Sequence, residues 1–368
     1  MEKVIGIIPA NYTTGDMRGM TRTRTIASLP FGASYRMIDF PLSNMVNSGI
    51  KSVGVITPMH CRSLLDHIGF GKNWQLDCKV GGLFFLPEAI ERANRCARNF
   101  FLSDMKENRE FLTRSPAPYA IFSSCHYVYN LDYQPILRQM REQDADIMLI
   151  CGEHVRNDSN CRGVRLDKEG RVIGLSDRKK EDELAFLGTF IIRRELLLRV
   201  VEQYDEYNPR NVFELIARDL PELKIRSYLH TGYVGCIVSV LDYFRCSQDL
   251  LASVKIRHDL FATGRQIHTK IYDSVPSRFH PEAKMRNSII SSGVDIRGSV
   301  ENSVIFRSVS IGEGARVRNS ILMPGAVIGR NTVVENAIID KHVEISDGVL
   351  LRGAPKHPII GGRDHNSF

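Results

Sequence analysis

Residues 310–334 read SIGEGARVRNSILMPGAVIGRNTVV, and apolar residues recur there every six positions between glycines and small polar residues. A period of six fits neither an α-helix nor a single long strand, but it is typical of a left-handed parallel β-helix with one hexad on each side of a triangular coil. We therefore predict this fold for residues 287–368, with a flat apolar side available to another subunit. The six-residue register runs through Ile321, Val327, Val333, Ile339, Ile345 and Leu351, after an earlier phase at Ile305, Ile311 and Val317.

The chain before this coil has a different character. Its 368 residues are too many for one ordinary core, so we predict a separate domain at 1–248 and a linker at 249–286. The linker contains Tyr272, Pro276 and Pro281 with little periodicity, which predicts an extended segment on the surface.

Short apolar runs alternate with helical patterns in residues 1–248. This alternation predicts a doubly wound α/β domain of Rossmann-like type, with ligands beyond the carboxyl ends of the strands. The expected strands are Val4–Ile8, Ser52–Thr57, Tyr119–Ser123 and Ile147–Cys151. The expected helices are Pro41–Ser48, Cys61–His67, Asp104–Thr113 and Tyr133–Gln143.

Composition narrows the class of protein. An apolar fraction of 43% and a charged fraction of 25% are typical of a globular protein. We expect no membrane span, no signal peptide and a cytoplasmic location, because no apolar run is long enough and Glu2 precedes the first strand. The eight cysteines lack metal-ligand spacing, and the net charge of +7 comes with no nucleic-acid motif. We therefore expect neither a metal site nor a nucleic-acid partner.

Residues 29–50, LPFGASYRMIDFPLSNMVNSGI, resemble the first βα unit of bacterial ADP-glucose pyrophosphorylase, glucose-1-phosphate adenylyltransferase. The resemblance extends from Val4 to Leu351. It implies a nucleotidyltransferase domain for catalysis, a β-helix for oligomer contacts and effectors bound between the two. It also implies a reaction in which a sugar phosphate attacks a nucleoside triphosphate with the help of Mg²⁺.

This chain departs from the family pattern at the catalytic positions. The glycine-rich phosphate loop is replaced by residues 9–15, PANYTTG, and Ile26 stands where the family has a lysine. The two carboxylates expected at the metal are replaced by Cys125, in SSCHY, and Tyr233, in TGYVG. We therefore interpret the catalytic site as degenerate and expect this chain to bind no metal. The neighbour His126 raises the alternative of a nucleophilic Cys125, against a plain thiol at the end of a strand.

Two further groups of residues bear on ligand binding. Arg178 and Lys179 replace the family's sugar-phosphate lysine motif and form a vestigial substrate site, and the nearby Phe186 replaces a small residue of the sugar site. Three arginines near the start of the chain, Arg22, Arg24 and Arg36, are candidates to bind a phosphorylated effector. For Arg36, the alternative role is a structural ion pair.

Some bacteria pair the catalytic subunit with a shorter, catalytically deficient homologue in a heterotetramer, and this chain resembles that regulatory subunit. The expected function is regulation of a Mg²⁺-dependent catalytic paralogue in glycogen biosynthesis. Three alternatives remain open at this stage. They are an active sugar nucleotidyltransferase with a rebuilt site, a hexapeptide-repeat acyltransferase that uses His342, and a metabolite sensor without a catalytic partner.

Overall fold

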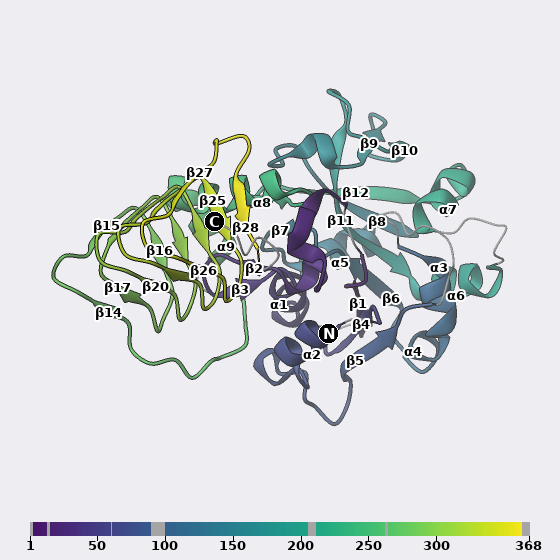
Figure 1. Ribbon diagram of the computed structural model, residues 1–368. Coiled ribbons are helices and arrows are strands. Elements are labelled where there is room, and N and C mark those ends of the chain that lie inside the picture. The colour runs from purple at the N-terminus through teal and green to yellow at the C-terminus, as the bar shows by residue number, and fades with distance from the viewer. Residues whose placement is uncertain are drawn as a thin grey trace.

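A computed structural model of the chain describes residues 3–12, 15–59, 61–89, 100–204, 211–261 and 264–362. An α/β domain lies beside a triangular coil of short parallel strands (Figure 1). This arrangement confirms the predicted pair of folds.

The α/β domain is built on one mixed sheet with the strand order β10-β9-β11-β6-β1-β4-β5, in which β8 pairs with β11 and β12. The predicted parallel pairing holds for β1, β4, β5 and β6, whereas β11 runs antiparallel to β6, β8 and β9. The strands are β1 (Val4–Pro9), β4 (Ser52–Thr57), β5 (Gly82–Pro87), β6 (Tyr119–Ser123), β8 (Ile147–Gly152), β9 (Gly163–Leu166), β10 (Val172–Ser176), β11 (Leu184–Arg193) and β12 (Ile225–His230).

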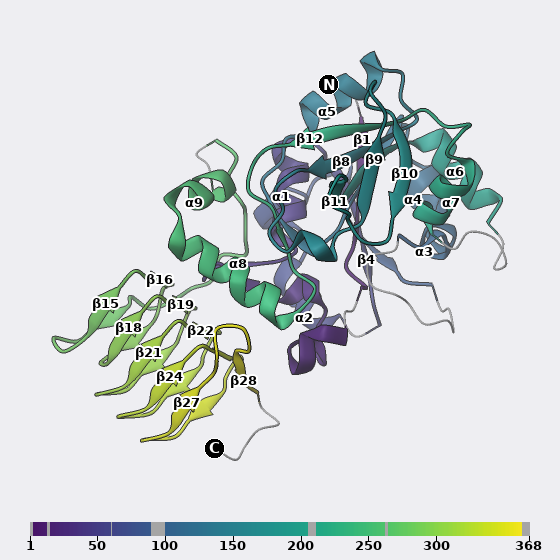
Figure 2. The same ribbon diagram turned by 90° about the horizontal axis from the view of Figure 1, so that it is seen from above.

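Alternate side chains of the buried strands point into two apolar cores on opposite faces of the sheet. In β1, Val4 and Ile8 join the core with α1, α5 and α8, whereas Ile5 and Ile7 join the core with α3, α4, α6 and α7. The same division of the helices is visible from above (Figure 2). The helices are α1 (Asp39–Asn47), α2 (Arg62–Ile68), α3 (Leu102–Glu107), α4 (Arg109–Thr113), α5 (Tyr133–Glu142), α6 (Arg194–Glu202), α7 (Val212–Asp219), α8 (Val240–Ala252) and α9 (Val254–Phe261).

Most expected elements agree closely with the structure, but the single helix predicted at 104–113 is two helices. They meet at Asn108, whose side-chain amide donates to the carbonyl oxygens of Pro87 and Asp104 at 2.8 Å each. Local side-chain bonds of this kind compete with helix hydrogen bonds.

The coil consists of three parallel sheets, one on each side of the triangle. The first contains β14 (Arg278–Phe279), β17 (Asp295–Ile296), β20 (Ser310–Ile311), β23 (Val327–Ile328) and β26 (Glu344–Ile345). The second contains β15 (Lys284–Arg286), β18 (Ser299–Glu301), β21 (Arg316–Arg318), β24 (Val333–Glu335) and β27 (Leu350–Arg352). The third contains β16 (Ile289–Ile290), β19 (Val304–Ile305), β22 (Ile321–Leu322), β25 (Ala337–Ile339) and β28 (Ile359–Gly361).

The repeat of the coil is shorter than three full hexads. Val300 pairs with Val317, Val317 with Val334 and Val334 with Leu351, so each coil falls one position short of three hexads. The shortened side contains a corner residue with positive φ, Asn302, Asn319 or Asn336, in successive coils. Asparagine tolerates this left-handed conformation better than most residues.

The shorter coil overturns part of the predicted register. Val327 is 37% exposed and Val333 is half-buried, although both were expected in the core. Their neighbours Ile328 and Val334 point inward and are buried instead. A strict period of six is one position too long at each shortened side. Between Val317 and the next shortened side, the predicted residues are therefore one position away from the residues that point inward.

The prediction is correct again in the following coil. The inward residues there are Ile339, Ile345 and Leu351, which are buried in the core of the coil as expected. The earlier predicted phase is therefore correct up to Val317, and the later one is correct from Ile339 onward. The error is confined to the residues between them.

The segment expected as an extended linker is partly ordered into regular elements. It contains the end of α8 and the whole of α9, and the first strands of the coil, β14 and β15, begin before residue 287. The coil pattern was missed there because its first step, from Met285 to Val300, is shorter than the steps that follow.

The third sheet of the coil packs against this chain's own α/β domain. Val304, Ile321 and Ile338 point outward from that sheet and are buried in the same apolar core as α8 residues such as Leu250. The flat apolar side that we expected to be available to another subunit is therefore covered within the chain.

Candidate functional site

The expected catalytic region lies beyond the carboxyl ends of β1 and β6. After β1, Asn11 is buried and its side-chain amide donates to Asp104 Oδ2 at 2.9 Å. Thr13 and Thr14, which stand in the replaced phosphate loop, lie outside the described residues.

Tyr12 occupies this region with an aromatic ring. The ring is buried, and its centroid lies 6.1 Å from the rings of Phe100, Phe101 and His126. A phosphate-binding loop needs exposed backbone amides that can approach the ligand. A packed cluster of rings offers apolar surface instead, which is consistent with the predicted loss of the loop.

Ile26 lies in a short 3₁₀ helix, Ile26–Ser28, and its side chain is buried in the apolar core shared by the two domains. The family's lysine would place an ammonium group at this position. The structure places a hydrocarbon there, so this position supplies no positive charge to a phosphate.

Cys125 follows β6 and is fully buried. Burial raises the pKa of its thiol well above the ordinary value, so the thiol stays protonated near neutral pH. The neighbouring His126 instead exchanges hydrogen bonds with Ser124: its Nδ1 lies 3.1 Å from Ser124 Oγ, and its backbone N–H donates to the same oxygen at 3.2 Å. This environment disfavours the alternative of a nucleophilic thiolate.

Tyr233 is close in the fold to the Cys125 loop, because the short strand β13 (Gly235–Cys236) pairs with β7 (Tyr127–Val128). The Tyr233 hydroxyl donates to Asp249 Oδ2 of α8 at 3.0 Å. Arg156 Nε lies 3.1 Å from the same carboxylate. Burial raises the pKa of Tyr233, so the phenol is neutral.

These residues do not fit a Mg²⁺ ion, which takes oxygen ligands with carboxylates among them. One expected ligand is a buried neutral thiol and the other a phenol bonded to α8. Across the described ranges, His, Cys, Asp and Glu side chains form no group of three or more that could hold a metal.

The two residues expected at a vestigial substrate site are paired with another residue or exposed. Lys179 Nζ forms an ion pair with Asp158 at 3.2 Å, and Arg178 is exposed. Phe186 is buried, with its ring 5.0 Å from that of Phe213 in an edge-to-face contact. The ring therefore fills space where the family has a small residue.

A second site lies at the junction of the two domains. A cavity of about 10 Å³ is lined by residues of the α/β domain, of the segment before the coil and of the coil itself. Such a volume admits about one water molecule. The polar residues that line it are Ser34, Arg36, His67, Tyr272, Arg307 and Lys341.

Arg36 enters this cavity from β3 (Tyr35–Arg36). Its Nη1 donates to the Ser63 carbonyl at 2.6 Å and to Ser63 Oγ at 3.1 Å, and burial lowers the pKa of its guanidinium. Arg307 of the coil stacks on Tyr272, with the guanidinium carbon 3.5 Å from the ring centroid. Two guanidinium groups from different domains thus share one small cavity.

Lys341 adds a third positive group to the cavity. Burial, followed by repulsion from Arg36, Arg24 and Arg307, lowers its pKa to about 7. A cluster of like charges is unfavourable by itself and becomes favourable when an anion neutralises it. The three groups therefore favour an anion such as phosphate, which the cavity of about 10 Å³ could admit only if the domains moved apart.

The predicted effector arginines separate in the structure. Arg36 lines the cavity. Arg24 is buried beside it and bridges the domains, with Nη2 2.5 Å from Asp340 of the coil and Nε donating to the Met20 carbonyl at 2.8 Å. Arg22 is exposed and does not line the cavity.

A hydrogen-bonded chain links the cavity to α1. Tyr272 Oη lies 3.3 Å from His67 Nδ1, and His67 Nε2 lies 2.6 Å from Asp39 Oδ1 at the start of α1. The second carboxylate oxygen of Asp39 accepts the backbone N–H of Arg36 at 2.8 Å. Direct contacts therefore connect the cavity to a helix of the α/β core.

The family models match both halves of the chain. A nucleotidyl transferase model covers residues 16–222, more than half of the chain, and a model described as a GlmU-like C-terminal hexapeptide covers residues 274–354. This chain belongs to the nucleotidyl transferase family.

Alignments with curated relatives span nearly the whole length of the chain. The chain is 27% identical to the glycogen biosynthesis protein GlgD of Bacillus subtilis over 97% of this chain and 95% of the relative. It is 29% identical to a glucose-1-phosphate adenylyltransferase of Bacillus mycoides and 28% identical to one of Bacillus cereus, each over 95% of both chains. The first of these relatives is named for glycogen biosynthesis, and the other two are named as glucose-1-phosphate adenylyltransferases.

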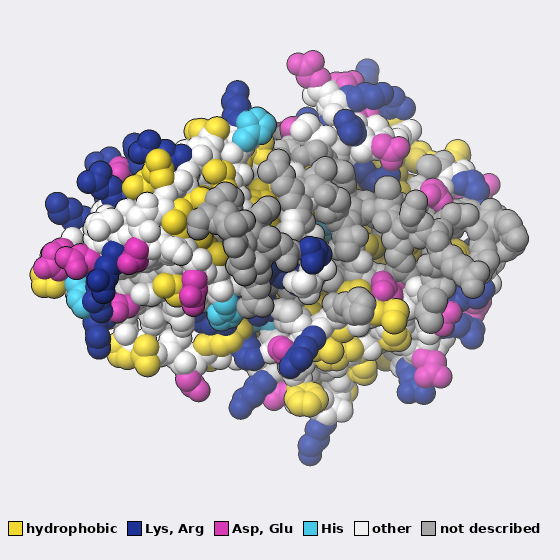
Figure 3. Space-filling view, in the orientation of Figure 1, with side chains coloured by type: hydrophobic (Ala, Val, Ile, Leu, Met, Phe, Trp, Pro, Cys, Tyr) yellow, Lys and Arg dark blue, Asp and Glu magenta, His cyan; other side chains and the backbone are white. Residues whose placement is uncertain are grey.

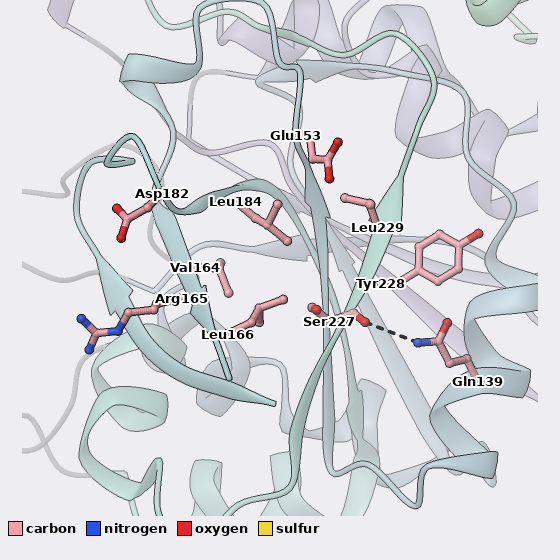
Figure 4. Close-up of a pocket in the computed structure, with 10 residues that line it drawn as sticks. All are labelled: Gln139, Glu153, Val164, Arg165, Leu166, Asp182, Leu184, Ser227, Tyr228 and Leu229. Carbon is pink, nitrogen blue, oxygen red and sulfur yellow. Dashed lines mark hydrogen bonds between the residues drawn. The ribbon is translucent and has the colours of Figure 1, made fainter. Parts of the chain in front are cut away.

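A further hollow, of about 840 Å³, lies over the face of the sheet between β9, β12 and α5 (Figure 4). Gln139 donates there to the Ser227 carbonyl at 3.4 Å. The charged groups Glu153, Arg165 and Asp182 stand at its margins, and none of the predicted site residues lines it. Its lining mixes polar and apolar side chains, and the charged groups do not converge on one point.

The sequence did not point to Arg307, Lys341 or Tyr272 as site residues. Arg307 and Lys341 occupy ordinary outward positions of the coil pattern, and Tyr272 lies in a segment without periodicity. His342, the acyltransferase alternative, is an exposed corner residue with φ of 55°, and its ring packs over Gly325. Within the described ranges no helix has the length and apolarity that a membrane span requires.

Proposed function

We propose that this chain is a regulatory subunit of a glucose-1-phosphate adenylyltransferase in glycogen biosynthesis, with little or no turnover of its own. Its partner in this proposal is a catalytic paralogue that carries the intact phosphate loop and both metal carboxylates, joined with it in a hetero-oligomer such as a heterotetramer. Mg²⁺ is needed by the paralogue and not by this chain.

The observation that carries the proposal is the combined loss at the strand ends. Tyr12 fills the region of the phosphate loop, and neutral Cys125 and Tyr233 stand where metal carboxylates are expected. Phosphoryl transfer depends on positioning and on positive charge around the phosphates. The relative named for glycogen biosynthesis supports the pathway, and the relatives named as glucose-1-phosphate adenylyltransferases support the reaction.

The junction cavity supports the regulatory half of the proposal. Arg36, Arg307 and Lys341 come from two domains and would neutralise a phosphorylated metabolite together. The cavity is too small for such a ligand, so the effector must bind a more open arrangement of the domains. A ligand that prefers one of two arrangements shifts the population toward it, and the paralogue would sense that shift.

The test is reconstitution of the purified chain with the catalytic paralogue from the same organism. We expect the mixture to form ADP-glucose faster, or with a changed response to phosphorylated effectors, than the paralogue alone. The chain alone should be almost inactive. Full activity of the isolated chain, or a mixture that behaves as the sum of its parts, would refute the proposal.

A further inference from the structure

A notch interrupts one corner of the coil. The corner between the first and second sheets has four residues in most coils, such as 312–315 between β20 and β21. In the second coil, only Arg297 and Gly298 separate β17 from β18. The strands on both sides keep their pairing with the neighbouring coils, so this shorter corner is set back between them. The resulting notch has a volume of about 590 Å³.

The notch lies apart from the junction cavity. The third sheet of the coil packs against the α/β domain, and Arg307 and Lys341 lie at the corners that follow this sheet. The corner between the first and second sheets is the vertex of the triangle opposite the third sheet. All residues that line the notch belong to the coil. A ligand in the notch would therefore contact a different part of the molecule from a ligand at the junction.

The floor of the notch consists of small residues in close contact. Gly298 and Ala315 are buried there, and Ser299 is half-buried. A β-carbon on Gly298 would lie 2.4 Å from the carbonyl oxygen of Ala315 and 2.9 Å from that of Gly312. The short corner can therefore lie against the next coil only because residue 298 is glycine. These small side chains leave the space above them open.

Cations outnumber acids on the walls of the notch. All six charged side chains are exposed; they are Lys284, Arg297, Arg316 and Arg330, with the acids Glu282 and Glu313. Three of the four cations are arginines, whose planar guanidinium group can bind phosphate oxygens through two parallel hydrogen bonds. The composition of the walls favours an anion.

Two rows of the second sheet differ in how their charges are paired. The last residues of its strands alternate in charge and pair at 3.3–3.9 Å, in the order Arg286, Glu301, Arg318, Glu335 and Arg352. The first residues of the same strands are Lys284, Ser299, Arg316, Val333 and Leu350, with no acid among them. Within the described ranges, Lys284 and Arg316 form no ion pair. The row beside the notch therefore lacks the pairing that its neighbour has.

Unpaired charge, and not charge alone, distinguishes the notch. Charged side chains cover much of the coil surface in Figure 3, so an exposed cation on the coil is ordinary by itself. Arg330 also forms no ion pair in the part of the chain that the structure describes, whereas Arg297 Nη2 lies 3.5 Å from Asp295. Like charges around a hollow repel one another, and a multivalent anion between them relieves this repulsion.

The shape of the notch favours a small, highly charged anion over an acidic peptide. Lys284 and Arg316 lie two strands apart, about 10 Å at the usual strand spacing, so their long side chains can reach one ligand between them. The volume is in the usual range for small-molecule sites. An extended peptide would bind best along a free strand edge, but β17, β18, β20 and β21 are paired on both sides.

We propose that this notch binds a small oligophosphate, a linear anion of two or more linked phosphate groups, through Lys284, Arg316 and Arg330. The two acids on the walls disfavour ligands of low charge and so select a multivalent anion. The site goes beyond the proposed regulatory function and does not depend on it.

The experiment titrates inorganic tripolyphosphate into the full chain and measures binding by calorimetry. The parent is compared with proteins that all carry Arg307→Ala, which weakens anion binding at the junction. In that background, Lys284→Gln with Arg316→Gln should weaken binding at least about tenfold, because two charge-assisted contacts are lost. Arg286→Gln with Arg318→Gln is the matched control, since it removes the same charge from the same two strands but from the paired row. It should bind as the background protein does.

A second variant tests the notch without a change in charge. Ser299→Tyr places a ring on the floor of the notch and should also weaken binding at least about tenfold, because the ring would occupy the space of the ligand. The thermal unfolding midpoint of every variant checks that the fold is kept.

Three results would overturn the proposal. Equal losses in the Lys284/Arg316 and Arg286/Arg318 variants would mean that the probe responds only to net charge. Unchanged binding to a folded Ser299→Tyr protein would mean that the probe binds elsewhere. If the parent binds hexaglutamate but not tripolyphosphate, the notch is a groove for an acidic protein segment. None of these results concerns stimulation of the catalytic paralogue, so the regulatory proposal is tested separately.

Discussion

The strand-end region and the domain junction show opposite changes in charge. At the strand ends, the expected lysine and carboxylates are replaced by Ile26, Cys125 and Tyr233, and aromatic rings pack in the space. At the junction, Arg36, Arg307 and Lys341 converge on one cavity. Charge is costly to bury unless it is paired. The buried charge at the junction therefore favours the proposed ligand site there, and its loss at the strand ends favours a packed core.

The largest expected effect tests whether the strand-end region is a packed core. The variant Cys125→Asp restores one expected carboxylate, but it places that group at a fully buried position beside neutral neighbours. We expect a loss of several kcal/mol in the free energy of unfolding and no gain in Mg²⁺-dependent ADP-glucose formation. The activity of the isolated parent should stay about a thousandfold or more below that of the catalytic paralogue.

Thermal unfolding and a pyrophosphate-release assay measure the two effects. Cys78→Asp is the matched control, because Cys78 is exposed. A Cys125→Asp protein as stable as the parent, with new Mg²⁺-dependent turnover, would show that the region is an open active site.

The next effect concerns the ion pair that joins the domains. Arg24→Ala removes the partner of Asp340 and leaves a half-buried carboxylate at the junction. Breaking a buried pair from one side costs about 3–5 kcal/mol, and we expect the lower end because Asp340 is partly exposed. Arg22→Ala, at an exposed position, is the control and should leave the midpoint of denaturant unfolding unchanged.

The measured quantity is the unfolding midpoint of the full chain in urea. Equal midpoints for the two variants would mean that the Arg24–Asp340 bridge does not hold the coil against the α/β domain.

Effector binding provides a third test, because cations are candidate ligand-binding groups in both regions. Arg36→Ala or Arg307→Ala should weaken the response of the reconstituted complex to a phosphorylated metabolite about tenfold to a hundredfold, because a charge-assisted hydrogen bond contributes roughly 1.5–3 kcal/mol. The control variant, Arg178→Ala with Lys179→Ala, changes the vestigial substrate site and should leave that response nearly intact.

Titration of the effector against the reconstituted complex provides both numbers. If the Arg36 variant responds to the effector as the parent does, and the Arg178/Lys179 variant loses the response, the effector binds at the expected substrate site and not at the junction.

The sequence predicted the parts of the fold that depend on local pattern. The strands Ser52–Thr57 and Tyr119–Ser123 agree with the structure because buried parallel strands are continuous apolar runs. The coil was also recognisable, but Val327 and Val333 were misplaced because the coil that contains them falls one position short of three hexads. Register depends on the corners, and an error of one position moves a side chain to the opposite face.

The candidate site could be predicted only where one residue decides the chemistry. The absence of a carboxylate at Cys125 and Tyr233 is visible in the sequence. The packing of Tyr12 against Phe100 and Phe101 is not, because those residues are distant in the chain. Of the cations at the junction cavity, the sequence indicated Arg36 but not Arg307 or Lys341, because these two residues reach the cavity only when the coil packs against the α/β domain.

The smallest effect is a dependence of anion binding on pH. The pKa of Lys341 is lowered to about 7 in the free protein, and a bound anion would favour the charged ammonium and raise that pKa. Between the two pKa values, binding takes up a proton, so affinity is fully present below pH 7 and falls by up to tenfold per pH unit above it. Sulfate is a suitable probe because its own charge is constant from pH 6 to 9, unlike that of a phosphate ester. Calorimetric titration with sulfate across that range, at fixed ionic strength, measures the slope. Lys341→Met should bind more weakly at pH 6 and lose the slope, whereas Lys179→Met should keep it. A parent protein whose sulfate affinity is flat with pH would mean that Lys341 does not take part in the anion site.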